Sequence, residues 1–371
     1  MRATAAGGLL AAILALAACG SSESTSSYVP EVGANSPLAT SLATASDSWA
    51  LVPVAANPAF WQVFVRPTSS AKWQLVTPPG VAITGGLVAA NAGSGLTVAV
   101  RPSEDLQFSP LAFTTDGGAK WSPGGPIDAP VAASPDAFAA SGSELVALLT
   151  DGTVETSANA GTTWRVIAKP GAIASSAGKS CGAVTVTSVS FENKGTDVLA
   201  GGTCGTSGTT VIFAYSGGSW QQVSLPVSGQ FVRLTDGVAL VRAKAGLTAL
   251  FNGGWTAYAP LATTPPPTVW TKSSPLPVSS AIKASGTLAG GGAWVVLTNG
   301  AGATIGGPGQ QWLPLPPLPA KTSVLAAGPG GATDALAVSG ATVTVWQLAP
   351  KATVWTKVQA INVPVQYGSS S

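Results

Sequence analysis

The sequence contains no histidine, and only 9% of its 371 residues are charged. Without histidine, Ser-His-Asp and Cys-His nucleophilic sites are excluded, and the commonest zinc ligand is missing. The 17 basic and 15 acidic residues show no run of one sign. Because a nucleic-acid binder needs a basic stripe to neutralise phosphates, we expect no nucleic-acid partner. The glycine-rich segments lack the lysine of a phosphate loop, so we expect no cofactor. Because histidine is absent, we also expect no metal site.

Long hydrophobic runs are also scarce. The apolar run near the N-terminus is too short for a persistent transmembrane helix, and it ends in Leu-Ala-Ala-Cys at positions 16 to 19. This sequence matches the bacterial lipobox, in which the cysteine is lipidated after cleavage. We therefore expect residues 1–18 to be a lipoprotein signal peptide, with an ordinary signal peptide as the alternative. Cys19 would then anchor the chain, and residues 19–35 would form a flexible Gly/Ser-rich tether.

The chain has three cysteines, and lipidation of Cys19 would leave Cys181 and Cys204 as a pair. Both are equally distant from the turn-like segment 192–195, so a hairpin would bring them face to face. An exported compartment permits disulfides. We expect a Cys181–Cys204 disulfide, with two free buried thiols as the alternative.

A short apolar run recurs seven times, usually with an acidic residue or glycine at its head, at intervals of 39 to 56 residues. The seven heads are Asp47, Gly95, Glu144, Asp197, Asp236, Gly292 and Asp334. Each run is followed after 19 to 26 residues by a tryptophan, and these are Trp73, Trp121, Trp164, Trp220, Trp255, Trp312 and Trp355. A repeat of this length, with about four strand-sized segments, is typical of a β-propeller.

The repeat predicts an all-β fold, a seven-bladed β-propeller of four-stranded antiparallel blades. It would occupy residues 36–365 as a single domain, leaving 366–371 as a C-terminal tail. In every repeat a proline follows the tryptophan segment, and proline is confined to edge strands and strand ends. We therefore interpret the tryptophan as the start of the outermost strand of each blade. We expect the protein to be a monomer.

The fifth repeat, expected at 228–285, is irregular because it contains two tryptophans and a proline-rich stretch between them. Trp255 keeps the usual offset from Asp236, whereas Trp270 lies 34 residues after it. We predict that Trp255 is the blade tryptophan and that Trp270 lies on a proline-rich loop, where it is a candidate binding residue.

Two of the turns before the tryptophan share a sharper pattern, Ser/Thr-x-Asp/Asn-x-Gly-x-x-Trp. Its members are Thr114, Asp116, Gly118 and Trp121 in one turn, and Ser157, Asn159, Gly161 and Trp164 in the other. The pattern resembles the Asp-box, or bacterial neuraminidase repeat. The chain is thus similar to Asp-box propellers of the photosystem II assembly-factor, sortilin-like and sialidase types. The resemblance implies a structural role for these residues: the acid or amide caps the turn, and the tryptophan packs between blades.

Sialidases share this fold, so a divergent or degenerate glycoside hydrolase is one alternative. The resemblance implies that a sialidase would need three arginines, a Tyr–Glu pair and an aspartate. This chain has six arginines, of which Arg2 would be cleaved off and Arg165 directly follows a blade tryptophan. We interpret the non-repeating acids as solvated loop charges; these are Glu104, Asp105, Asp151 and Glu155. We predict no catalytic residues.

These observations predict a non-catalytic lipoprotein of the cell envelope, anchored to the outer face of the cytoplasmic membrane or an equivalent cell-surface membrane. Its propeller would bind a protein or an envelope glycan through one face of the ring, by analogy with other propellers. The second alternative, which the photosystem II assembly-factor resemblance suggests, is an assembly factor for an envelope complex.

Overall fold

The computed structural model describes residues 39–43, 47–54, 61–78, 87–92, 95–100, 111–123, 135–192, 197–205, 208–235, 238–255, 268–278, 280–288 and 291–364. The expected signal peptide, Cys19, the tether and the C-terminal tail lie outside these ranges. Within them the chain forms 28 strands, one short α-helix and two 3-10 turns. No helix among these residues is long and apolar enough to cross a membrane.

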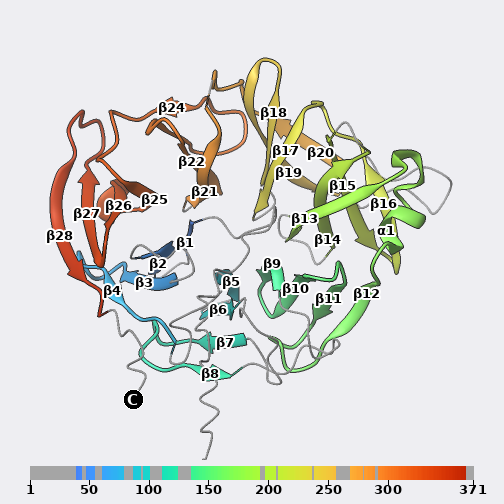
Figure 1. Ribbon diagram of the computed structural model, residues 1–371, viewed down its shortest axis with the longest axis horizontal. Helices are drawn as coiled ribbons and strands as arrows, with labels where there is room; N and C mark the ends of the chain where they lie inside the picture. The colour runs from blue at the N-terminus through green and yellow to red at the C-terminus, as the bar shows by residue number, and fades with distance from the viewer. Residues whose placement is uncertain are drawn as a thin grey trace, which may run out of the picture.

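The strands form seven consecutive antiparallel groups of four, arranged as the blades of a ring (Figure 1). The first four blades are β1 (Thr40–Ala43), β2 (Asp47–Pro53), β3 (Trp61–Pro67) and β4 (Gln74–Leu75); β5 (Leu87–Ala92), β6 (Gly95–Val100), β7 (Leu111–Thr114) and β8 (Ser122–Pro123); β9 (Pro135–Ser141), β10 (Glu144–Leu149), β11 (Val154–Ser157) and β12 (Arg165–Ala168); and β13 (Val184–Phe191), β14 (Val198–Cys204), β15 (Thr209–Ser216) and β16 (Ser219–Val223).

The last three blades are β17 (Gln230–Thr235), β18 (Val238–Ala243), β19 (Gly246–Trp255) and β20 (Thr268–Lys272); β21 (Ile282–Leu288), β22 (Gly292–Leu297), β23 (Gly302–Ile305) and β24 (Leu313–Pro314); and β25 (Thr322–Ala327), β26 (Thr333–Ser339), β27 (Thr342–Leu348) and β28 (Thr356–Asn362). A single bridge between Thr209 and Gln230 joins the fourth and fifth blades into one eight-stranded sheet. The all-β, seven-bladed propeller predicted from the repeat is confirmed.

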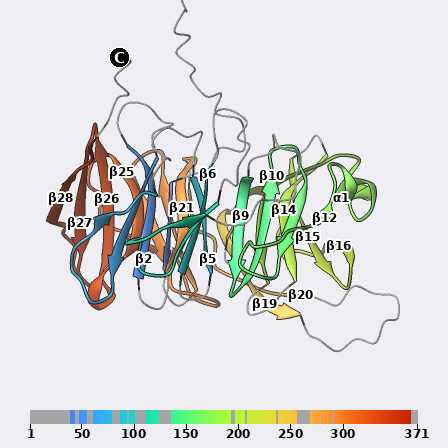
Figure 2. The same ribbon diagram turned by 90° about the horizontal axis from the view of Figure 1, so that it is seen from below.

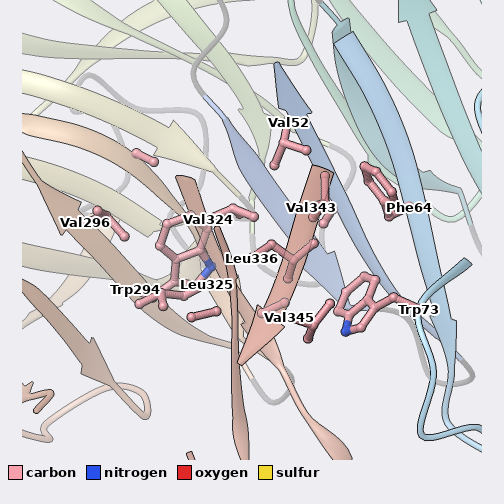
Figure 3. Packing of buried hydrophobic residues seen from close by; sticks show 14 of the residues in the cluster. Val52, Phe64, Trp73, Trp294, Val296, Val324, Leu325, Leu336, Val343 and Val345 are labelled. Atoms are coloured by element: carbon pink, nitrogen blue, oxygen red, sulfur yellow. The ribbon is translucent and has the colours of Figure 1, made fainter. Parts of the chain in front are cut away.

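The recurring apolar runs are the second strands of the blades, as predicted. All six residues of β22 are buried, and so are the last five of β10. A strand that is covered on both faces has no polar side, so its sequence is a continuous apolar run. The core is therefore divided among the interfaces between neighbouring blades. Figure 3 shows two such interfaces, on either side of the seventh blade, where Trp294, Leu336 and Phe64 come from the sixth, seventh and first blades.

Every blade is built from four consecutive strands, so among the described residues no strand is exchanged between the first and last blades. In the part of the chain that the structure describes, the ring is closed by side-chain packing and side-chain hydrogen bonds, where β25–β28 pack against β1–β4 (Figure 1). This closure depends on the packing and polar contacts of that one interface.

The disulfide between Cys181 and Cys204 is present, with a Cα–Cα distance of 5.0 Å. The predicted hairpin is also present, because β13 and β14 pair from Phe191 and Val198 outward. Cys181 itself, however, lies in the 3-10 turn η1 (Lys179–Cys181), before β13 begins. The bond therefore ties the link between the third and fourth blades, which contains α1 (Ala172–Ser175), to the end of β14. The other 3-10 turn is η2 (Pro329–Gly331).

The prediction for the fifth blade was wrong. Trp255 ends the third strand, β19, and Trp270 lies in the outer strand β20, where it pairs with Asn252. Trp270 is therefore the blade tryptophan and not part of a loop. The expected blade boundary at residue 285 also falls inside β21. The offset failed because twelve residues, 256–267, separate β19 from β20, and a fixed spacing cannot allow for a turn of that length.

Candidate functional site

The order of the strands gives the ring two different faces, which the edge-on view of Figure 2 separates. Because neighbouring strands are antiparallel, the links between blades and the links from second to third strands lie on one face, which we call the connection face. The turns from first to second and from third to fourth strands lie on the other, the turn face. The described chain begins at Ala39 and ends after β28, and both ends lie on the connection face.

The two sharp turns before Trp121 and Trp164 lie on the turn face and share one hydrogen-bond pattern. In the first, Asp116 Oδ1 accepts from Lys120 N at 2.9 Å, and Thr114 Oγ1 accepts from Gly118 N at 3.0 Å. In the second, Asn159 Oδ1 accepts from Thr163 N at 2.9 Å, and Ser157 Oγ accepts from Gly161 N at 2.8 Å. The middle glycines have φ of +84°, which a side chain would strain. These polar side chains therefore form their hydrogen bonds within their own turns.

The blade tryptophans connect each blade to the one before it. In five blades the indole N–H of the tryptophan donates a hydrogen bond to the preceding blade or to the link that leaves it. The pairs are Trp73 with Asp334, Trp121 with Val76, Trp220 with Ile167, Trp312 with Ser273, and Trp355 with Pro316. Trp164 instead donates to Gly161 in its own turn. Trp270 packs against a cluster that joins the fourth and fifth blades and includes Ile212 and Leu250. Trp270 thus fills the same kind of interface as the others.

The most concentrated polar group in the described structure closes the ring, and we call it the ring-closing cluster: Arg66, Trp73, Asp334, Gln347 and Gln359. Arg66 is 2% exposed and Asp334 is 1% exposed, and Arg66 Nε lies 3.4 Å from Asp334 Oδ2. Asp334 Oδ2 also accepts from Trp73 Nε1 at 2.9 Å, and Oδ1 accepts from Gln347 Nε2 at 3.1 Å. Both carboxylate oxygens therefore have partners across or along the closing interface.

Further contacts in this cluster also link the first blade to the last. Arg66 Nη2 donates to the carbonyl of Ala327 on β25 at 2.6 Å and to Ser48 Oγ at 3.1 Å. Gln359 on β28 forms two hydrogen bonds with the backbone of Trp73, each of 2.8 Å. Burial raises the pKa of Asp334, while hydrogen bonds from Gln347 and Trp73 and the charge of Arg66 offset part of that rise. In the sequence Asp334 is only one of the seven strand heads, because its partners Arg66 and Trp73 are more than 260 positions away.

The residues that a carbohydrate-cleaving site would need lie apart in the described structure. Arg66 belongs to the ring-closing cluster, Arg165 is exposed on the outer strand β12, and Arg242 lies near the connection face. Asp151 caps its own turn, since its carboxylate accepts from the backbone N–H and the hydroxyl of Thr153. Glu155 was expected to be a solvated loop charge, but it is fully buried within β11. Glu104 and Asp105 lie outside the described residues, as do Arg2, which was expected to be cleaved off, and the expected lipidation site Cys19.

The described residues contain no group of three or more Cys, Asp and Glu side chains that could hold a metal ion.

No protein-family model and no curated protein matches this sequence. Solved structures do match. The chain is similar to YCF48 from Cyanidioschyzon merolae, with 14% identity and a TM-score of 0.51, over 85% of this chain and 96% of that one. It is also similar to a protein from Lactobacillus plantarum, with 11% identity and a TM-score of 0.52, over 86% of this chain and 97% of that one. At these identities the likeness establishes the β-propeller fold.

Proposed function

We propose that this protein is a non-catalytic, lipid-anchored propeller of the cell envelope that binds a protein or an envelope glycan through one face of its ring. The observation that carries the proposal is how the described polar side chains are used. Asp116, Asn159 and Asp151 cap turns, while Arg66 and Asp334 hold the ring closed. With these groups engaged in the scaffold, the loops of the two faces are the surfaces available for a ligand. An assembly factor for an envelope complex would be one form of this function.

Anchoring is tested by the Cys19→Ala variant of the full chain. We expect it to lose fatty-acid labelling and to leave the membrane fraction or accumulate as an uncleaved precursor, since the lipobox cysteine is the acylated residue. The matched control is Cys204→Ala, which removes another cysteine and should keep the label. Fatty-acid labelling that is unchanged in Cys19→Ala would contradict the anchor.

Binding through one face is tested by photo-cross-linking in intact cells. We would place benzoylphenylalanine at Lys120 on the turn face or at Lys244 on the connection face, both of which are exposed. Val358, which is 46% exposed on the outer strand β28, provides a control on the rim of the ring. We expect a defined protein or glycan adduct from one face and none from the rim, because propeller ligands contact the face loops. Equal adducts from all three positions, or none from either face, would contradict the proposal.

A further inference from the structure

One stretch of this chain is unbalanced in charge. From Gly237 to Thr333 the sequence contains no aspartate and no glutamate, although it contains five cations, Arg242, Lys244, Lys272, Lys283 and Lys321. The overall balance of 17 basic and 15 acidic residues conceals this stretch. Apart from Arg242 and Lys244, the cations are separated by 11 to 38 positions, so they do not form a run that sequence inspection would notice.

The fold brings four of these cations to the same part of one face. Arg242 is near the end of β18 and Lys244 is in the turn that follows, so both lie at the connection face of the fifth blade. Lys283 is the second residue of β21, and Lys321 directly precedes β25, so they lie at the same face of the sixth and seventh blades. We call these four residues the basic sector; its three blades are adjacent in the ring (Figure 1). Lys272 lies further down the outer strand β20.

The basic sector has no carboxylate partner among the described residues. Arg242 Nη2 donates to the carbonyl of Ser280, and Lys283 Nζ donates to the carbonyl of Thr322 at 2.8 Å. Lys321 Nζ donates to the hydroxyl of Ser339 at 3.0 Å. Partial burial lowers the pKa of Lys283. These contacts orient the cations but leave their charge uncompensated, so an anion from outside the chain would be attracted.

The charge distribution elsewhere on the ring is different. On the turn face, cations and acids are interspersed; its described members include Lys72, Lys120, Lys351, Asp47, Asp116, Glu144 and Asp197. On the connection face of the third blade and of the link that follows it, the cations Lys169 and Lys179 are interspersed with two acids, Asp136, the second residue of β9, and Asp151, which lies in a turn. The uncompensated positive charge is therefore a property of the connection face of the last three blades.

The connection face also carries the start of the described chain. Ala39 immediately precedes β1, and Cys19 lies only 20 positions earlier in the sequence. An anchor at Cys19 would keep this face the nearer one to the bilayer. We propose that the basic sector lies against anionic lipid headgroups of the membrane to which the chain is tethered; this rests on the anchoring proposed above. Cations beside a lipid anchor strengthen attachment to an anionic surface and orient the attached domain. The turn face would then point away from the membrane, toward a partner.

The test measures how fast individual lysines are acylated in the full-length, acylated protein reconstituted into vesicles. A neutral amine-reactive reagent is applied, and each lysine is quantified by mass spectrometry. The vesicles are either phosphatidylcholine alone or phosphatidylcholine with phosphatidylglycerol. We expect Lys244, Lys283 and Lys321 to react at least about threefold more slowly on the anionic vesicles, because the negative surface covers them and favours the protonated amine. High salt should remove the difference.

The turn-face lysines Lys72, Lys120 and Lys351 are the internal controls, since they are also exposed and should react equally on both vesicles. A variant with Lys244→Gln and Lys321→Gln should lose the remaining protection of Lys283, whereas Lys72→Gln with Lys351→Gln should retain it. Equal reactivity of the basic sector on both vesicles, with the protein still anchored, would overturn this inference and leave anchoring intact. Failure of the protein to stay on either vesicle would overturn the anchoring itself. Protection by added polyglutamate but not by anionic vesicles would assign the sector to an acidic protein and overturn the membrane proposal.

Discussion

Replacing Asp334 by alanine is expected to lower the free energy of unfolding by about 3–5 kcal/mol, because it leaves the buried charge of Arg66 without its carboxylate. The indole N–H of Trp73 and the amide of Gln347 would lose their acceptor as well. Since no described strand is shared between the first and last blades, the described hydrogen-bonded sheets do not compensate for a weakened closure. Urea unfolding followed by tryptophan fluorescence measures the loss.

Glu144→Ala is the matched control for this variant, because Glu144 also heads a second strand but is only half-buried. We expect a change of about 1 kcal/mol or less for a side chain in that setting. Combining Asp334→Leu with Arg66→Met should recover part of the stability, since an apolar pair leaves no buried charge unpaired. If Asp334→Ala is no more damaging than Glu144→Ala, the ring-closing cluster does not hold the ring together.

The same residue should make stability depend on pH. Burial raises the pKa of Asp334 above its ordinary value of 3.8, so in the interval above pH 3.8 the folded chain retains a proton that the unfolded chain has released. Its contribution to stability is therefore complete below pH 3.8 and declines as the pH rises through the folded-state pKa. Subtracting the pH profile of Asp334→Asn, which cannot ionise, isolates this contribution. If the difference instead grows with rising pH, the charge of Arg66 outweighs burial.

Replacing Trp270 by alanine is expected to cost about 3–5 kcal/mol of unfolding free energy, a loss comparable to that of Trp164→Ala. The reason is its place in the outer strand β20, where it packs on the cluster shared by the fourth and fifth blades. A loop position would predict a change within about 0.5 kcal/mol. Thermal unfolding of the two variants side by side distinguishes the two placements.

Leu313→Ala is the control for Trp270→Ala, since Leu313 also lies on an outer strand, β24, but is 62% exposed. We expect it to unfold close to the unmodified protein. A Trp270→Ala variant that unfolds like Leu313→Ala and loses only ligand capture would restore the binding role expected from the sequence and contradict the packing described for β20.

The sequence alone determined the architecture, because a propeller blade is a local unit. Each blade contains four consecutive strands, so the apolar second strand, the turn and the tryptophan recur in order along the chain. Burial of the second strand on both faces produces the continuous apolar runs of β10 and β22, which are visible without coordinates. The pairing of Cys181 with Cys204 was also accessible, because the two residues flank a single hairpin.

Only the tertiary structure decided the features that join distant segments. The contact of Arg66 with Asp334 joins residues 268 positions apart, and no local pattern distinguishes Asp334 from the other strand heads. The role of Trp270 depended on the length of the turn before β20, which a repeat spacing cannot supply. The basic sector arises because a ring places the ends of successive blades side by side, so cations 38 and 39 positions apart in sequence share one surface. The order of residues along the chain determines the strands of each blade. Closing the blades into a ring brings distant segments together and so determines which charged and polar side chains share a face.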